Sequence, residues 1–203
     1  MRKSRLFPAV LLACLFLASC APVIVGRTPQ PAAPEEWEFS LNLGYPFLNS
    51  YKNDFPNGPT QTPAAQPVNL LLSRGVGGNT EVNGTLSLSY IPSLRLGGKT
   101  LLVGGTLPVA VDYGVSLPLD LGFDAGLLLS YPQPGVEPYG ALRGFVTGVT
   151  NLPGLSGALT VGADIPAGTG NFFVEVTAHT TTQPYAPLLP LGFSIVPALG
   201  YRF

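Results

Sequence analysis

Residues 106–131 read TLPVAVDYGVSLPLDLGFDAGLLLSY, and this stretch decides the fold class. Every second residue is apolar from Leu107 to Leu117, and the alternation resumes from Leu119 to Tyr131. Small and acidic residues fill most of the positions between them, namely Ala110, Asp112, Gly114, Ser116, Asp120, Gly122, Asp124 and Gly126. A period of two places successive side chains on opposite faces of a β-strand. The stretch therefore predicts two strands, each apolar on one face and polar on the other.

The same alternation recurs on both sides of this stretch and predicts about ten strands, with eight and twelve as the alternatives. The predicted strands are Trp37–Tyr45, Val68–Arg74, Glu81–Tyr90, Ser93–Leu102, Thr106–Leu117, Leu119–Tyr131, Glu137–Val149, Leu155–Ile165, Asn171–Thr181 and Leu191–Phe203. Residues 46–66 contain four prolines and are predicted to form a long loop. Pro108 and Pro197 fall inside predicted strands, where each removes a ladder donor. They indicate a bulge, a rim position or a different strand limit.

Charged residues are scarce, and this scarcity points to a surface that is not covered by water. Asp, Glu, Lys and Arg make up 10% of the chain, against about 25% in ordinary soluble domains. After the first 19 residues there is no apolar run of about 18 residues that could form a spanning helix. Only helices and closed barrels satisfy every backbone polar group in lipid. An all-β fold with a single antiparallel transmembrane β-barrel over residues 37–203 is therefore expected.

The residues on the polar face of the predicted strands favour an enclosed lumen over an open, hydrated surface. They are mainly Gly, Ser, Thr and Asn, with few charges. Nearly all strand charges share this face, which makes them candidate lumen residues: Glu38, Glu81, Arg95, Lys99, Asp112, Asp120, Asp124, Arg143, Asp164, Glu175 and Arg202. Opposite charges in a confined space can pair across strands. Aromatic residues near strand ends, with apolar parity, are typical of interfacial girdles: Trp37, Tyr45, Tyr90, Tyr113, Tyr131 and Tyr201.

The N-terminus predicts export. Arg2, Lys3 and Arg5 precede an apolar run over residues 6–16, as in a cleaved signal peptide. The sequence Leu-Ala-Ser-Cys at 17–20 resembles the bacterial lipobox, which implies that Cys20 becomes a lipidated N-terminus after residues 1–19 are removed. Ala21 in the next position resembles lipoproteins sorted to the outer membrane. Residues 21–36 are Pro-rich with little to pack, so segment 20–36 is expected to be a flexible tether.

The C-terminus carries a second resemblance. Gly200-Tyr201-Arg202-Phe203 ends on an aromatic residue after alternating apolar positions, and it resembles the terminal strand signature that the outer-membrane barrel-assembly machinery recognises. Together with residues 139–143, this ending makes the chain similar to small bacterial outer-membrane β-barrel proteins. The resemblance implies localisation in the bacterial outer membrane. It also implies Tyr201 and Phe203 as an assembly signal, with the barrel-assembly and lipoprotein-processing machinery as partners.

Several other functions are disfavoured. Ten Lys and Arg stand against eleven Asp and Glu, and three of the basic residues lie in the signal, so no nucleic-acid partner is expected. Cys14 lies in the signal and Cys20 is expected to be acylated, which leaves no cysteine for a disulfide or a metal. Asp120 and Asp124 are too far apart along a strand to chelate one ion. No cofactor or metal site is predicted.

The only histidine is His179, and it is the one candidate for catalysis. Glu175 shares its face but lies about 13 Å away along a strand, so a catalytic partner would have to come from a neighbouring strand. The leading hypothesis is a lipid-anchored outer-membrane barrel without enzymatic activity, with a role in envelope structure, adhesion or small-solute passage. The alternatives are a soluble periplasmic β-sandwich or open barrel that binds an apolar ligand or a partner protein, and an outer-membrane hydrolase that uses His179. The oligomeric state is left open.

Overall fold

The strands form one antiparallel sheet that closes on itself. The computed structural model describes residues 25–45, 48–51, 68–88, 93–117, 121–147, 154–183 and 186–203. Its strands are β1 (Trp37–Gly44), β2 (Leu48–Tyr51), β3 (Val68–Gly77), β4 (Thr80–Leu88), β5 (Ser93–Val103), β6 (Val109–Leu117), β7 (Gly122–Ser130), β8 (Glu137–Thr147), β9 (Gly154–Ala167), β10 (Gly170–Gln183) and β11 (Ala186–Arg202).

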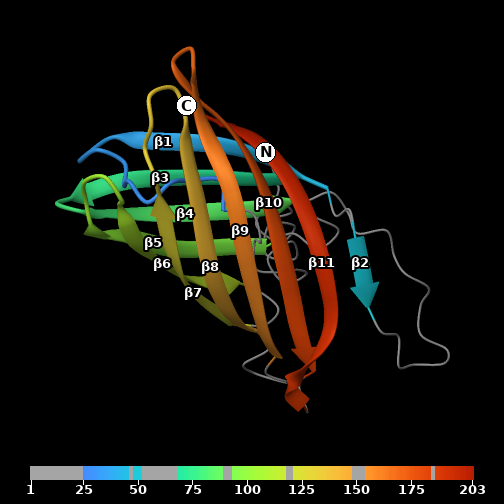
Figure 1. The fold of residues 1–203 in the computed structure, drawn as a ribbon. Helices are drawn as coiled ribbons and strands as arrows, with labels where there is room; N and C mark the ends of the chain where they lie inside the picture. Colours follow the sequence, from blue (N-terminus) through green and yellow to red (C-terminus); the bar gives the residue numbers. More distant parts are fainter. Residues whose placement is uncertain are drawn as a thin grey trace, which may run out of the picture.

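Closure occurs between the first and the last strand. From β3 to β11 each strand pairs with the next one in the chain, and β1 pairs with both β3 and β11. β1 together with β3 to β11 therefore makes a ten-strand barrel, as the sequence predicts. In Figure 1 the wall of β8 to β11 crosses the wall of β3 to β5, as expected for tilted strands on opposite sides of a barrel. The sandwich alternative is wrong, because the sheet closes on itself instead of stacking on a second sheet.

The prediction of an unbroken loop over residues 46–66 is wrong at β2. This short strand pairs with β11 beyond the end of β1, so the two segments follow one another along the same neighbour. Gly44 and Leu48 are four residues apart, whereas their partners Ala198 and Ile195 are three apart. A one-residue register shift therefore separates the two segments. The sequence does not reveal β2 because four residues are too few for alternation to be recognised.

The two prolines inside predicted strands have different outcomes. Pro108 lies in the connection between β5 and β6, so the predicted strand start at Thr106 is too early. Pro197 lies within β11, where its carbonyl accepts a hydrogen bond of 2.9 Å from the Tyr45 backbone N–H. This position falls where pairing with β1 ends, and the ladder tolerates a missing donor at such a break.

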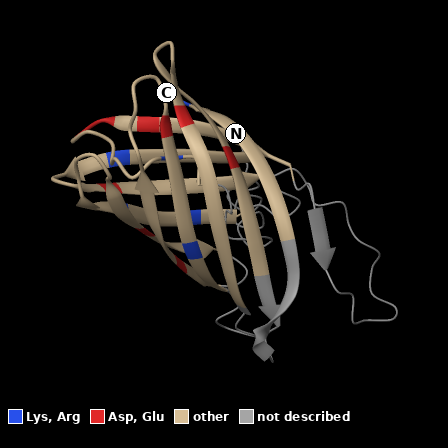
Figure 2. Ribbon diagram, viewed as in Figure 1, with Lys and Arg blue, Asp and Glu red and all other residues tan. Residues whose placement is uncertain are grey.

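Burial alternates along the strands and separates an apolar exterior from a polar interior. In β7, for example, Phe123, Leu127 and Leu129 are exposed, whereas Asp124 and Ser130 are buried. Charged positions are few on the ribbon, and most of those on the strands belong to the buried set (Figure 2). β8, whose pattern is apolar in both parities, turns Tyr139, Arg143 and Phe145 inward. No helix in the described residues is long and apolar enough to cross a bilayer.

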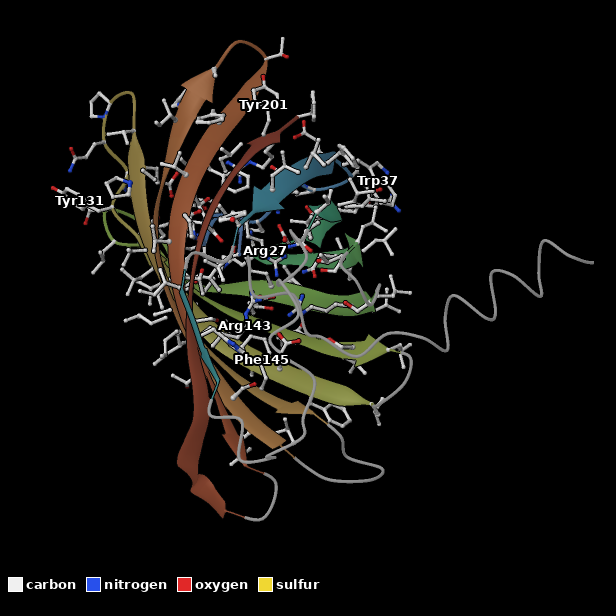
Figure 3. The ribbon with its side chains drawn as sticks, turned by 90° about the vertical axis from the view of Figure 1, so that its right-hand side faces the viewer. Arg27, Trp37, Tyr131, Arg143, Phe145 and Tyr201 are labelled. Atoms are coloured by element: carbon white, nitrogen blue, oxygen red, sulfur yellow. The ribbon has the colours of Figure 1, made fainter. Side chains whose placement is uncertain are left out.

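Most of the predicted girdle residues lie on the exterior. Trp37 and Tyr131 are exposed on different sides of the barrel end that carries the short turns, and Tyr201 lies near the end of β11 (Figure 3). Tyr45 is exposed at the opposite end of β1. The prediction for Tyr113 is wrong in its position along the strand: its side chain is exposed, but it lies in the middle of β6 and pairs with Gly98. The sixth member of the predicted girdle, Tyr90, is outside the described residues.

Candidate functional site in the barrel lumen

The lumen is occupied by the chain itself. Residues 25–36, here called the lumen segment, run through the barrel interior before they reach β1, and Arg27 lies at its centre (Figure 3). Val25, Arg27, Thr28 and Ala32 are all buried. The expectation that this part of the tether has little to pack is therefore wrong. The physical reason is that the polar wall of a ten-strand barrel offers partners to the backbone and side chains of a segment that forms no strand or helix.

The lumen segment leaves the interior at the rim near the end of β3. The Ala32 N–H donates to the Glu81 carboxylate at 2.9 Å. Further on, the Glu35 N–H donates to the Gly75 carbonyl at 2.9 Å, and the Gly75 N–H donates to the Glu36 carbonyl at 3.2 Å. Glu35 also pairs with Arg74 on the exposed rim. The segment therefore passes from the interior to the rim along β3 and β4.

Arg27 makes the central contact between the lumen segment and the wall. Its guanidinium pairs with Glu81 on β4 at 3.1 Å and with Asp112 on β6. Asp112 also accepts hydrogen bonds from Arg95, at 3.2 Å, and from Arg143. One fully buried carboxylate thus serves three guanidiniums. An ion pair this deep is sensitive to change, because removing one partner leaves an uncompensated charge in a low-dielectric interior.

Lys99 clamps the segment from β5. Its ammonium donates to the Thr28 carbonyl at 2.9 Å and to the Gln30 carbonyl at 2.7 Å. It also lies 3.2 Å from the Glu81 carboxylate. Because an ammonium has three donors, these three partners satisfy it completely. The segment therefore supplies carbonyl acceptors to a wall lysine that is itself fully buried.

The deepest described part of the segment is held from the other side of the barrel. The Val25 and Gly26 N–H groups donate to the Glu175 carboxylate on β10, at 2.8 and 2.9 Å. The Tyr139 hydroxyl donates to the same carboxylate at 2.7 Å. The Val25 side chain belongs to a small apolar cluster with Leu128, Tyr139 and Ala141. Glu175, which carries no basic partner in these contacts, is thus satisfied by three neutral donors.

Gly26 is required at its position for two reasons. Its φ is 58°, in the left-handed region that favours glycine. A Cβ atom at this position would also lie 2.5 Å from Nδ2 of the Asn42 side chain and 2.9 Å from the Phe173 ring. Any larger residue would therefore push the segment away from the wall.

The ion pairs around Asp112 continue along the wall through Arg95. Arg95 donates to Asp124 through Nε at 2.8 Å and through a terminal nitrogen at 2.6 Å, which is a bidentate pairing. It also donates to the Asn83 side chain at 2.9 Å. Gly114 gives the guanidinium its room, since a Cβ there would lie 2.6 Å from it. Bidentate pairs of this kind fix the geometry of both side chains.

The structure brings most of the predicted lumen charges together. Buried in the interior are Glu81, Arg95, Lys99, Asp112, Asp124, Arg143, Asp164 and Glu175. Arg202 is mostly buried and pairs with Asp164, whereas Glu38 is half-buried and lines a small cavity beside Arg27. Asp120 and Cys20 lie outside the described residues. Arg27 itself was missed, and the available signal was that it is the only basic residue in the Pro-rich segment 20–36.

The predicted assembly residues lie at the closing seam. The Tyr201 hydroxyl donates to the Ala167 carbonyl at 2.6 Å. The Phe203 N–H donates to the Phe39 carbonyl of β1 at 2.8 Å, and the rings of Tyr201 and Phe203 lie 4.7 Å apart edge to face. The terminal residues therefore continue the pairing of β11 with β1.

Among the described residues, no nucleophile or base is hydrogen-bonded to His179. Its ring meets the Phe145 ring edge to face at 6.0 Å. Ser194 lies opposite it on β11, but no hydrogen bond joins the two side chains among the contacts described for this part of the chain. A nucleophile and its base need to be within hydrogen-bonding reach. Within the described ranges, no group of three or more His, Cys, Asp or Glu residues is arranged to hold a metal ion.

Little space remains between the lumen segment and the wall. The cavity beside Arg27, Arg95 and Arg143 has a volume of about 10 Å³, which is about the room that one water molecule needs. Around these three arginines the polar interior is therefore largely occupied by side chains and by the lumen segment.

The exterior defines the class of protein. Large apolar side chains stay exposed in the middle of the strands, such as Leu142 at 61% and Val161 at 60%. A soluble protein rarely exposes an apolar surface of this extent. An even number of antiparallel strands, closed around a polar interior and apolar outside, is the architecture of outer-membrane β-barrels. The chain is thus a membrane-spanning β-barrel of the outer-membrane type.

Comparisons with known proteins identify solved structures that are similar at low sequence identity. No protein-family model matches the chain, and no curated protein matches it. The N-terminal β-barrel domain of Pseudomonas aeruginosa OprF is 12% identical, with 84% of this chain and 98% of that chain covered and a TM-score of 0.33. The Yersinia pestis outer membrane protein Ail is 15% identical, with 83% and 100% covered and a TM-score of 0.35.

A third similar structure is the outer membrane protein OprG of Pseudomonas aeruginosa. It is 13% identical, with 87% of this chain and 99% of that chain covered and a TM-score of 0.32. Identities and TM-scores as low as these say nothing about the function of the chain. The fold assignment rests on the strand pairing and on the two faces of the sheet described above.

Proposed function

We propose that this protein is a lipid-anchored structural protein of the bacterial outer membrane, with a barrel that is closed to solutes in its resting state. The observation that supports this role is the burial of residues 25–29 in the lumen, where the cavity beside Arg27, Arg95 and Arg143 has room for about one water molecule. Barrels of about eight strands are just filled by side chains, whereas open diffusion pores have about 16 to 18 strands. A ten-strand barrel that also encloses part of its own chain belongs with the filled barrels.

The lipid anchor is part of the same proposal. Cys20 is expected to carry it after removal of residues 1–19, because the residues before the cysteine resemble a lipobox. Tyr201 and Phe203 are proposed to be the residues that the barrel-assembly machinery recognises. Lipid and barrel would then hold the protein in the membrane independently of one another, which suits a structural role better than a soluble or transient one.

Conductance tests the closed state. Protein purified from membranes and inserted into planar bilayers is expected to give no stepwise current, whereas an open porin measured in the same bilayer does. Steady current steps from the unchanged protein would contradict the closed state and favour small-solute passage.

Fractionation tests the anchor and the barrel separately. The Cys20→Ala variant is expected to lose acylation, measured by mass spectrometry, and to stay in the outer-membrane fraction with heat-modifiable mobility on gels. A variant that appears in the aqueous fraction would show that the lipid alone holds the protein. Purified protein is also expected to show no lipid or peptide cleavage, and any cleavage that His179→Ala abolishes would favour the hydrolase alternative.

A further inference from the structure

The lumen segment is attached to the barrel in a way that allows release. Among the described residues, its backbone pairs with the wall backbone only around Gly75 at the rim. Deeper contacts run through wall side chains: Glu81, Lys99, Asp112 and Glu175. Ladder pairing locks a strand into a sheet over its whole length, but a few side-chain contacts can break together. The segment is therefore a separate body inside a barrel that closes without it.

We propose that the lumen segment is a removable plug and that the barrel behind it conducts small cations. This goes beyond the structural role proposed above, because it gives the barrel a second, open state. The closed state is the one described here, with Arg27 paired to Glu81 and Asp112.

The path left by the plug follows from the size of the barrel. Eight strands enclose a space that wall side chains just fill. Here ten strands enclose the wall side chains and, in addition, the buried residues Val25 to Pro29 and Ala32. The wall is kept in shape by cross-strand pairs that do not involve the plug, such as Arg95 with Asp124 and Arg202 with Asp164. Withdrawal of the plug would therefore leave a path about as wide as the chain that now fills it.

The charge of the wall favours cations. Among the described residues, five buried acidic side chains face four buried basic ones, and one of those basic residues is Arg27 of the plug. Without the plug, three basic residues remain against the five acids. The three carboxylates that the plug now satisfies, Glu81, Asp112 and Glu175, would all face the opened path. Rings and clusters of carboxylates select cations.

The experiment compares charge variants of the full-length protein in planar bilayers. Arg27→Glu places a carboxylate beside Glu81 and Asp112, so the plug is expected to be expelled. The open fraction should rise by about a hundredfold or more, because breaking a buried ion pair weakens binding by at least about two powers of ten. In a KCl gradient the reversal potential should lie toward the potassium equilibrium potential.

Two control variants are matched to this change. Ala33→Glu makes an acidic substitution within the same segment, at an exposed position, and should give no current. Arg27→Lys keeps the positive charge and should conduct far less than Arg27→Glu. Folding of every variant is checked by heat-modifiable mobility on gels.

A folded Arg27→Glu barrel that stays silent, or one that prefers chloride, would overturn the inference. If Arg27→Glu does not fold, Gly26→Val decides in its place, because a side chain at residue 26 cannot be seated between Asn42 and Phe173. A folded and silent Gly26→Val barrel would overturn the inference equally. Current from the unchanged protein would contradict the proposed closed state, whereas silence of the variants would contradict only the plug.

Discussion

The two sides of the lumen hold the same segment by different means. The side formed by β4 to β6, here called the ionic side, meets it with Glu81, Lys99 and Asp112. The side formed by β8 and β10, here called the aromatic side, meets it with Tyr139, Phe173 and the carboxylate of Glu175. On the ionic side, removing a group leaves a charge unpaired. On the aromatic side, it leaves a gap or a missing neutral donor. Substitutions on the ionic side should therefore have the larger effects.

The largest effect is expected from Asp112→Asn. This substitution takes the shared carboxylate away from Arg27, Arg95 and Arg143 and leaves a positive excess in a buried site. The free energy of unfolding should fall by about 3–5 kcal/mol. The measurement is urea unfolding of the purified protein in detergent micelles, followed by heat-modifiable mobility. If Asp112→Asn lost less stability than the aromatic-side variant Tyr139→Phe, the ionic side would not be the more sensitive of the two, contrary to this proposal.

A smaller effect is expected from Tyr139→Phe on the aromatic side. The ring and its contact with Val25 remain, but Glu175 loses one of its three donors. Hydrogen bonds to charged groups contribute about 1.5–3 kcal/mol, so a destabilisation in that range is expected in the same urea titration. Tyr131→Phe is the matched control, since it removes the same hydroxyl from a ring that is exposed outside the lumen. An unchanged midpoint for Tyr139→Phe would show that Glu175 does not depend on the hydroxyl.

A neutral pair away from the segment should matter less again. The Thr160 and Thr177 hydroxyls share a hydrogen bond of 2.7 Å between β9 and β10. Replacing Thr160 by Val leaves one buried hydroxyl without its partner, and about 1 kcal/mol of stability should be lost. The double variant with both residues changed to Val should recover part of this loss, because no unpaired hydroxyl then remains. A double variant less stable than the single one would contradict this account.

The smallest effect is expected at the rim, where the segment leaves the barrel. Glu35 and Arg74 form an ion pair whose side chains are 75% and 39% exposed. Water screens such a pair, so Glu35→Gln should change the free energy of unfolding by about 0–1 kcal/mol. Unfolding of the variant and of the unchanged protein is compared at low and at high salt. The difference between their free energies of unfolding should shrink as salt increases. A loss as large as that of Asp112→Asn would mean that the rim, not the ionic side, holds the segment.

The exterior of the barrel could be predicted from the sequence, whereas the content of the lumen could not. Alternation along residues 106–131 reports directly which side chains meet lipid, because side-chain parity in a strand is fixed by backbone geometry. The wall charges share the inward parity and were found in the same way. β8 was ambiguous because its lumen positions Tyr139 and Phe145 are as apolar as an exterior.

The lumen segment carries no period at all, since it forms neither a strand nor a helix. Its burial depends on contacts between residues far apart in the chain, such as those from Val25 to Glu175 and from Arg27 to Asp112. Composition favoured a free tether because proline-rich segments usually remain in solvent. Arg27 is the one residue that does not fit a free tether. Its burial is explained only by the excess of acidic residues on the lumen wall.

The position of the lumen segment directly before β1 constrains the order of assembly. The seam joins Ser40 to Arg202, which are 162 residues apart in the chain, so it is a contact of the kind that forms late in folding. Once β11 has paired with β1, residues 25–32 could enter only through an open end of the finished barrel. Threading is simpler while the sheet is still an open, curled ribbon. The stretch that leaves the ribosome before any strand would then be the last to be enclosed.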